Sequence, residues 1–135
     1  MDLAHLVGMS FSIDTRVQPS DTATVLGSGG IASLATPILI AWMEQAARDA
    51  VQPALPAGHT TVGSEVHIRH LAPTPVGGSV QVTASVVSID RRRITFRLSA
   101  RDEAGLIGEG THERFVVDCA RFMERLATRF EETGS

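Results

Sequence analysis

The chain has 135 residues, 43% of them hydrophobic and 20% charged, and a formal net charge of -3 at pH 7. We expect one globular domain over residues 1–135, because this length and composition suffice for a buried core. The single cysteine, Cys119, excludes an internal disulfide and a zinc site built on thiolates. All 12 basic residues are arginine, which excludes lysine Schiff-base catalysis, and the acidic balance argues against a nucleic-acid partner.

Two absences bear on location. No window of the sequence is long and apolar enough for a membrane span, and the N-terminal residues lack the pattern of a signal peptide. We therefore expect a cytoplasmic protein without a membrane partner.

The first half of the chain predicts one strand and one long helix. Polar and apolar residues alternate over 10–17, which is typical of a half-buried strand. Residues 20–34 are rich in glycine, serine and threonine and show no period, so we expect a loop or lid there. Thr36 and Pro37 have the residue types of a helix start, with Thr36 as the N-cap, and the helical pattern runs to about residue 51.

From residue 60 the hydrophobic period changes to two, which predicts four successive strands. They are expected over about 60–70, 80–89, 93–101 and 106–118. Val62 and Val66 are expected to share the apolar face of the first with His70. A change of phase at Val87 indicates a β-bulge in the second. Apolar residues spaced by four over 122–130 predict an amphipathic C-terminal helix.

The order of these elements predicts the fold. Strands joined by short turns pair antiparallel, and a single apolar-rich helix needs a curved sheet to cover it. We therefore expect an α+β fold of the hot-dog type, with a five-stranded antiparallel sheet around the long helix and a further helix at the C-terminus. The sheet edges would be protected by a second copy, so a homodimer is expected, with further pairing to a tetramer left open.

His70 is the first candidate for chemistry. It ends an apolar strand face that points toward the helix, where an imidazole can exchange protons near neutral pH. The alternative is a buried histidine with a purely structural hydrogen bond. Metal binding with His67 is not expected, because an odd separation on a strand sends the two rings to opposite faces. We expect neither a metal nor a cofactor.

Glu44 lies at the margin of the apolar stripe predicted for the helix. A partly desolvated carboxylate there can act as a general base or nucleophile. The alternative is an exposed ion pair with Arg48, one helical turn further on. Thr36 has two compatible interpretations, as a capping residue and as part of a helix N-terminus that stabilises negative charge on a substrate oxygen.

Two further features are candidates for substrate binding. Gly63 interrupts a β-branched strand, which indicates either a bulge or a close approach of substrate to the backbone. Arg91 and Arg92 belong to a basic hairpin turn that would suit the phosphates of a CoA arm, although such turns are often merely solvated.

Three segments resemble the fluoroacetyl-CoA thioesterase group of hot-dog thioesterases, over roughly residues 5–125. The first is Ala35–Glu44, with Thr36 and, eight residues on, Glu44 after a methionine. The second is Gly63 followed, seven residues later, by His70 and a Thr-Pro turn. The third is Gly108–Arg114, which reads Gly-Glu-Gly-Thr-His-Glu-Arg.

The resemblance implies hydrolysis of an acyl-CoA thioester by Thr36, Glu44 and His70, with Gly63 lining the acyl pocket and sites at the interface of a homodimer. His112 and Glu113 are interpreted as structural. Residues 20–34 lack the aromatic lid residues that the family pattern leads one to expect. Two alternatives remain open, a non-catalytic binding protein for acyl-CoA or small acids and a hot-dog hydratase or dehydratase.

Overall fold

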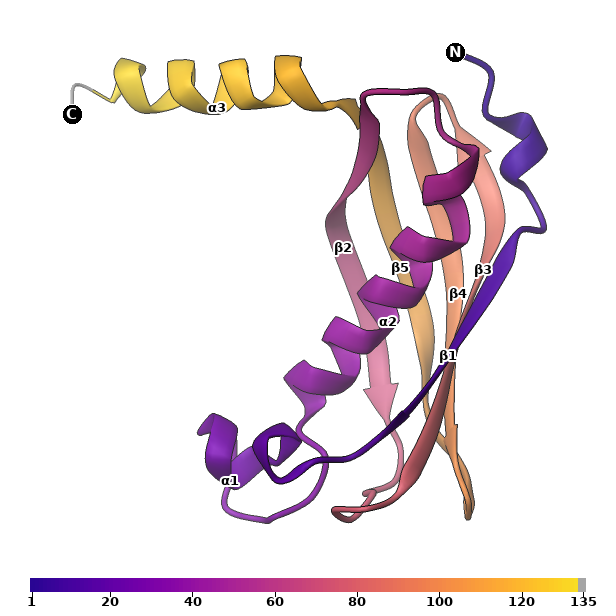
Figure 1. The fold of residues 1–135 in the computed structure, drawn as a ribbon, viewed down its shortest axis with the longest axis vertical. Helices are drawn as coiled ribbons and strands as arrows, with labels where there is room; N and C mark the ends of the chain where they lie inside the picture. The colour runs from indigo at the N-terminus through magenta and orange to yellow at the C-terminus, as the bar shows by residue number, and fades with distance from the viewer. Residues whose placement is uncertain (134–135) are drawn as a thin grey trace.

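The computed structural model describes residues 1–133, which form one antiparallel sheet of five strands with a long helix against it (Figure 1). The strands are β1 (Ser10–Arg16), β2 (His59–His70), β3 (Ser79–Asp90), β4 (Arg93–Asp102) and β5 (Gly105–Asp118). The helices are α1 (Ala23–Leu26), α2 (Thr36–Val51) and α3 (Cys119–Glu132), with 3-10 turns at Ala4–Leu6, Pro19–Asp21 and Gln52–Ala54. The predicted α+β hot-dog class is confirmed.

The sheet has the strand order β1-β3-β4-β5-β2, and every neighbouring pair is antiparallel. Strand β2 therefore lies at one edge, although it comes second in the sequence. Within the described residues it pairs only with β5, so its other side presents unpaired backbone groups.

The core lies between α2 and the face of the sheet that α2 crosses. The predicted alternation is clearest in β4, where Ile94, Phe96 and Leu98 are at most 1% exposed. They belong to one cluster with Leu39 and Met43 of α2, which are fully buried. Burial of each such side chain contributes about 1.5–3 kcal/mol, so this cluster fixes α2 on the sheet.

Two local expectations were wrong. Thr36 is not the N-cap of α2, because Ala35 occupies that position and no side chain caps the helix. Strand β2 contains a bulge between Gly63 and Glu65, which shifts its phase. Thr61 is consequently buried, and Val62 lies on the other side of the strand from the face predicted for it.

The bulge predicted near Val87 is confirmed by the register shift between Val86 and Ser88.

The segment expected to be an irregular loop contains one turn of helix, α1. The side chain of Thr22 accepts a hydrogen bond from the Val25 backbone at its start, and Gly27 ends it with φ 88°. The left-handed conformation favours glycine there. The segment before α2 is thus a folded turn.

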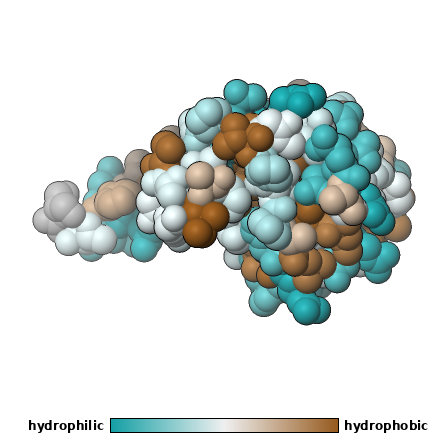
Figure 2. All heavy atoms as spheres, turned by 90° about the horizontal axis from the view of Figure 1, so that it is seen from below, coloured by the Kyte–Doolittle hydropathy of each residue, from teal (hydrophilic) through white to brown (hydrophobic). Residues whose placement is uncertain are grey.

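Helix α3 is amphipathic, as predicted, but it extends away from the sheet past β2 (Figures 1 and 2). None of its residues is buried. Among residues 1–133, no helix is both long and apolar enough to cross a membrane.

Candidate active site

Thr36 and His70 meet at the N-terminal end of α2. Thr36 is the first residue of that helix and His70 is the last residue of β2. The Thr36 Oγ1 lies 2.7 Å from His70 Nδ1. Because the hydroxyl caps no helix, it is available to the imidazole. The structure thus joins two of the predicted site residues in a hydroxyl–imidazole pair.

The other ring nitrogen of His70 faces no protein partner. His70 Nε2 is buried and has no hydrogen-bond partner among the described residues. Burial lowers the pKa of His70 below 6.5, and a contact with the Ala72 backbone opposes this shift. The ring is therefore neutral at pH 7. If the Thr36 hydroxyl donates to Nδ1, the ring hydrogen is on Nε2 and is available for donation.

A shallow pocket of about 450 Å³ surrounds this pair. Its walls come from the segment between α1 and α2 and from the turn after β2, and they include Ile31, Leu34, Leu71 and Pro73. Segment 23–35 therefore lies beside the candidate site, as expected of a lid.

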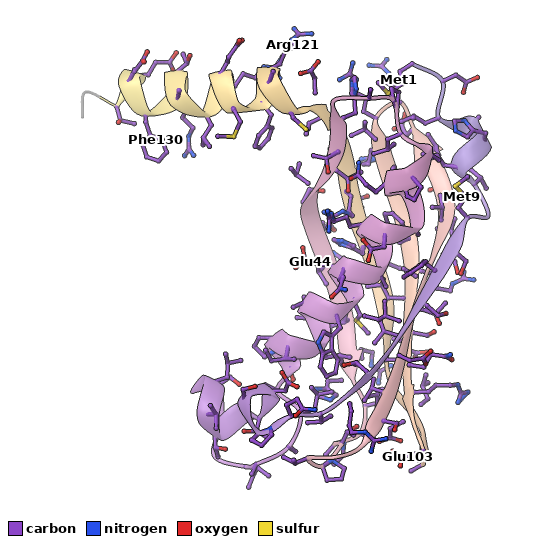
Figure 3. All side chains as sticks on the ribbon, in the orientation of Figure 1. Met1, Met9, Glu44, Glu103, Arg121 and Phe130 are labelled. Atoms are coloured by element: carbon purple, nitrogen blue, oxygen red, sulfur yellow. The ribbon has the colours of Figure 1, made fainter. Side chains whose placement is uncertain are left out.

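Glu44 occupies a different environment, midway along α2 (Figure 3). Its Oε2 lies 3.5 Å from NH1 of Arg114 on β5, whose side chain is only 7% exposed. The alternative pairing with Arg48 is wrong, because the Arg48 guanidinium lies beside Asp49 at 3.7 Å. Glu44 is thus directed toward the sheet rather than along the helix surface.

Arg114 is held by a buried network. Its Nε donates to Thr61 Oγ1 at 2.7 Å and its NH2 donates to the Thr61 carbonyl at 3.0 Å. His112 Nδ1 lies 2.8 Å from the Glu65 carbonyl, so it donates there, and its Nε2 can accept from Arg114 NH1 at 3.2 Å. Burial lowers the pKa of His112, which favours this neutral form.

Gly63 lies against Glu44. A Cβ atom at this position would lie 2.8 Å from Glu44 Oε2 and 3.3 Å from Arg114 NH1. A side chain there would displace the carboxylate. The bulge, one of the two interpretations of Gly63, is confirmed. The neighbour of Gly63 in the structure is Glu44, and the approach of substrate to this backbone stays a prediction.

The four predicted catalytic and acyl-pocket residues form two groups within one chain. Thr36 and Glu44 are eight residues apart on one helix, which separates them by about 12 Å along its axis. Gly63 lies with Glu44, and His70 lies with Thr36. A single chain thus does not bring Glu44 to the Thr36–His70 pair.

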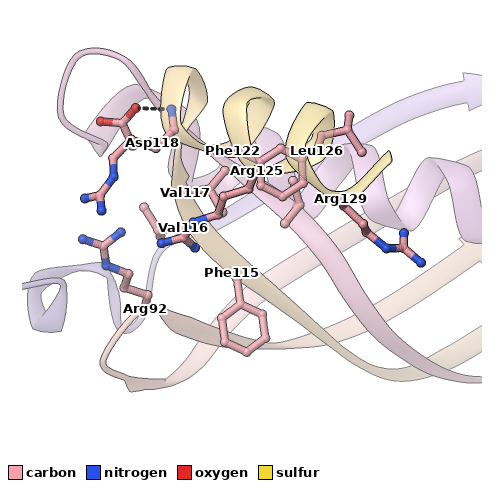
Figure 4. Close-up of a pocket in the computed structure, with 11 residues that line it drawn as sticks. Arg92, Phe115, Val116, Val117, Asp118, Phe122, Arg125, Leu126 and Arg129 are labelled. Carbon is pink, nitrogen blue, oxygen red and sulfur yellow. Dashed lines mark hydrogen bonds between the residues drawn. The ribbon is translucent and has the colours of Figure 1, made fainter. Parts of the chain in front are cut away.

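One arginine of the predicted basic turn lines a groove. Arg91 is exposed at the turn, with φ 58°, and Arg92 lines a groove of about 530 Å³ between α3 and the end of the sheet (Figure 4). Three arginines of α3, at 121, 125 and 129, line the same groove, together with apolar side chains that include Phe115 and Leu126. The structure therefore places three arginines of α3 beside Arg92, and the sequence alone did not link these arginines to phosphate binding.

Arg114 and His112 are the site residues that sequence reasoning missed. Both lie in the Gly108–Arg114 segment that carried the family resemblance, but they were given no functional role. His112 and Glu113 do face opposite sides, as expected, since His112 is 1% exposed and Glu113 faces Arg93. The alternation of inward and outward residues along β5 could have identified Arg114, because it places this charged side chain at an inward position.

Comparisons with known proteins agree with these features. A family model described as fluoroacetyl-CoA-specific thioesterase matches residues 17–120. The chain belongs to this family. The matched range includes Thr36, Glu44, Gly63, His70 and Arg114. The resemblance inferred from the sequence is confirmed.

Relatives of this thioesterase family extend the comparison. A fluoroacetyl-CoA thioesterase of Streptantibioticus cattleyicolor is 40% identical over 88 residues, which are 65% of this chain and 63% of the relative. The match therefore spans less than two thirds of that relative. A solved structure of a fluoroacetyl-CoA thioesterase is 34% identical, covers 90% of this chain and 95% of its own, and has a TM-score of 0.85.

Two other solved structures are similar over most of their length. A hot-dog-like protein from Thermanaerovibrio acidaminovorans is 29% identical, with 96% and 98% coverage and a TM-score of 0.90. A thioesterase superfamily member from Thermus thermophilus is 32% identical, with 93% and 96% coverage and a TM-score of 0.82.

Proposed function

We propose that this protein hydrolyses an acyl-CoA thioester to a free acid and CoA. The observation that carries the proposal is the Thr36–His70 hydrogen bond at the start of α2, with the second ring nitrogen unpartnered. Membership of the thioesterase family and the names of the solved relatives support it.

The reaction needs one water and no redox partner. The substrate carbonyl lies at the N-terminal end of α2, where backbone N–H groups stabilise the developing oxyanion. Glu44 either removes a proton from the attacking water or attacks the carbonyl itself and is released by water. The C–S bond breaks, and the departing thiolate is protonated through His70 Nε2. The proton that His70 gives up is replaced by one from the water that is consumed. The oxygen of water ends in the acid, and its hydrogens balance the two products.

This chemistry requires Glu44 to reach the carbonyl, and a homodimer supplies the approach. Gly63 and His70 lie on the same face of β2 and on either side of residues 66 and 67. A two-fold axis there would pair two copies of β2 antiparallel and set His70 of one copy opposite Gly63 of the other. Glu44, which contacts Gly63, would then face the Thr36–His70 pair of the second copy. Each dimer would hold two composite sites.

The phosphates of CoA would bind to arginines. Arg91 and Arg92 are placed by the turn before β4, and the three α3 arginines line the same groove as Arg92. Guanidinium groups bind phosphate in bidentate fashion. In the proposed dimer, this groove lies near the Thr36–His70 pair of the other copy. The exposed lone thiol of Cys119 fits a reducing compartment, which supports the cytoplasm as the location.

The test is direct. Purified protein is incubated with acetyl-, butyryl-, branched and aromatic acyl-CoAs, and released thiol is followed with a chromogenic reagent. Thiol release that exceeds the uncatalysed rate supports hydrolysis. Thermal stabilisation by acyl-CoA without release would instead indicate the binding protein. Loss of the enoyl absorbance of an enoyl-CoA, without thiol release, would indicate the hydratase.

A further inference from the structure

Helix α3 carries an apolar surface that the described residues of its own chain leave partly exposed. Phe122, Leu126 and Phe130 lie on one side of it, at intervals of four, and are 39%, 38% and 60% exposed. We call these three residues the apolar stripe. Asp118 caps the helix start by accepting from the Arg121 backbone at 3.1 Å. A 14-residue helix has little stability by itself in water. We therefore expect the apolar stripe to pack against another surface.

The stripe faces the space beside the free edge of β2. In Figure 1, α3 leaves the end of β5 and passes beyond β2, which is the edge strand. In Figure 3, Phe130 points from α3 toward the level of the sheet, whereas Arg121 points away from it. A second copy that extends the sheet at β2 would occupy that space.

A second exposed apolar surface lies at the other end of the sheet. Val25, Leu26, Ile31 and Leu71 are 66%, 44%, 72% and 41% exposed, and we call them the lid patch. Seen from that end, hydrophobic side chains interrupt the polar surface (Figure 2). Ile31 and Leu71 also line the pocket around the Thr36–His70 pair. The 12 residues of β2 separate the two surfaces by about 40 Å, so they do not meet within one chain.

We propose that the apolar stripe of each α3 covers the lid patch of a second copy of this chain. The proposal rests on the β2-paired dimer of the proposed function, because that two-fold exchanges the two ends of the sheet. It brings the stripe of one copy to the lid patch of the other. Residues 22–34 carry no charge, so the apolar stripe, and not the arginine side of α3, suits this surface.

The contact makes α3 part of the partner's site. Covering Ile31 and Leu71 would narrow the opening of the pocket beside Thr36 and His70 and reduce the access of bulk water. It would also position the arginines of α3 at the same opening, where the CoA phosphates remain outside the acyl pocket. Helix α3 would thereby link dimer formation to closure of the site.

Disulfide cross-linking tests this contact without an activity assay. In a Cys119→Ser background, Ile31→Cys is combined with Leu126→Cys, on the stripe. The matched control combines Ile31→Cys with Thr128→Cys, which lies about 160° away around the same helix. After mild oxidation, the stripe pair should give a covalent dimer on a non-reducing gel, and the control pair should remain monomeric there.

Monomers from both pairs, or equal cross-linking of both, would overturn the proposal. In a second experiment, light scattering compares Leu126→Asp with Thr128→Asp. Leu126→Asp should shift the population toward monomer while the circular dichroism of the sheet is kept, and an unchanged dimer would contradict the covered stripe. Cross-linking in a protein that releases no thiol would retain the contact and reject the hydrolase. Thiol release without cross-linking would do the reverse.

Discussion

The two groups of candidate site residues along α2 differ in their hydrogen-bond partners. At the start of α2, Thr36 and His70 form a neutral pair, and the buried Nε2 of His70 has no hydrogen-bond partner among the described residues. At the middle of α2, Glu44 lies against a buried guanidinium whose other hydrogen bonds go to Thr61 and His112. The first group has a ring nitrogen without a described hydrogen-bond partner, and the second group holds a carboxylate in a fixed position. In the proposed function these two groups are halves of one site, which a single chain keeps apart.

The largest effects should come from removing either half. His70→Ala removes the proton donor and Glu44→Gln removes the base or nucleophile, and each should lower kcat by about 10²–10⁴-fold. Thiol release under saturating acyl-CoA measures the effect, and circular dichroism checks folding. Near-normal turnover by a folded variant would remove that residue from the proposed chemistry.

Combining the two halves gives the sharpest test of their separation. Chains carrying His70→Ala and chains carrying Glu44→Gln, with different affinity tags, are co-expressed and the mixed dimer is purified. If each site uses residues of both copies, one of the two sites in the mixed dimer is intact. Activity should then return to about half of the wild-type value per dimer. If each site lies within one chain, both sites are defective and the mixed dimer stays as inactive as its parents.

Gly63→Ala should have a smaller effect that is specific to the Glu44 group. The new methyl group would lie 2.8 Å from Glu44 Oε2, so the carboxylate must move. We expect kcat to fall about 10–100-fold, because small displacements of catalytic groups are costly. The control is Ser64→Ala, at the exposed next residue. Unchanged kcat for Gly63→Ala would mean that the position of Glu44 is not critical.

The lid should have only a modest influence on the choice of acyl group. Its apolar side chains are aliphatic, since residues 20–34 contain no aromatic residue. Discrimination between fluorine and hydrogen requires groups positioned against that difference. We expect short-to-medium or branched acyl-CoAs to react faster than acetyl-CoA, and no strong preference for fluoroacetyl-CoA once each kcat/KM is divided by the uncatalysed rate. A large corrected preference would show that other residues replace an aromatic lid.

Acid should weaken the fold through His70 and His112, whose rings lose water on folding. Burial lowers the pKa of both His70 and His112 from 6.5, so below pH 6.5 the unfolded chain binds more protons than the folded chain. Stability is therefore complete above pH 6.5 and is lost as the pH falls toward the lowered values. Urea unfolding above and below pH 6.5 measures this slope.

His112→Asn should cost about 1–3 kcal/mol above pH 6.5, because buried polar partners lose a hydrogen bond. It should also reduce the acid slope, and His5→Gln, at an exposed position, is the control substitution. An equal slope in the His112 variant would assign the acid sensitivity to other groups.

Much of the fold follows from local patterns. The alternation of Ile94, Phe96 and Leu98 predicts a strand, and the phase change at Val87 predicts its neighbour's bulge, because both depend on residues adjacent in sequence. Helix α1 is too short to show a period. A bulge at Gly63 was one of two interpretations of that glycine, but the face of Val62 was assigned wrongly because Val62, Val66 and His70 also fit a regular strand.

The site was harder to predict because its contacts join distant segments. Thr36 looked like a cap until the position of His70, 34 residues later, gave its hydroxyl another partner. An ion pair of Glu44 with Arg48 was one interpretation of the sequence, whereas its partner Arg114 lies on the fourth strand after α2. The direction of α3 also could not be predicted, since an amphipathic pattern does not show which chain covers its apolar side.

In the proposed dimer, the free edge of β2 would make catalysis depend on protein concentration. If a working site needs two copies, the separated chain is folded but inactive. Activity per milligram would then be constant at high concentration and would fall on dilution toward the dissociation constant of the dimer, where initial rates become second order in protein. Substrate that spans both copies would oppose this loss, so saturating acyl-CoA should shift the fall to lower protein concentration.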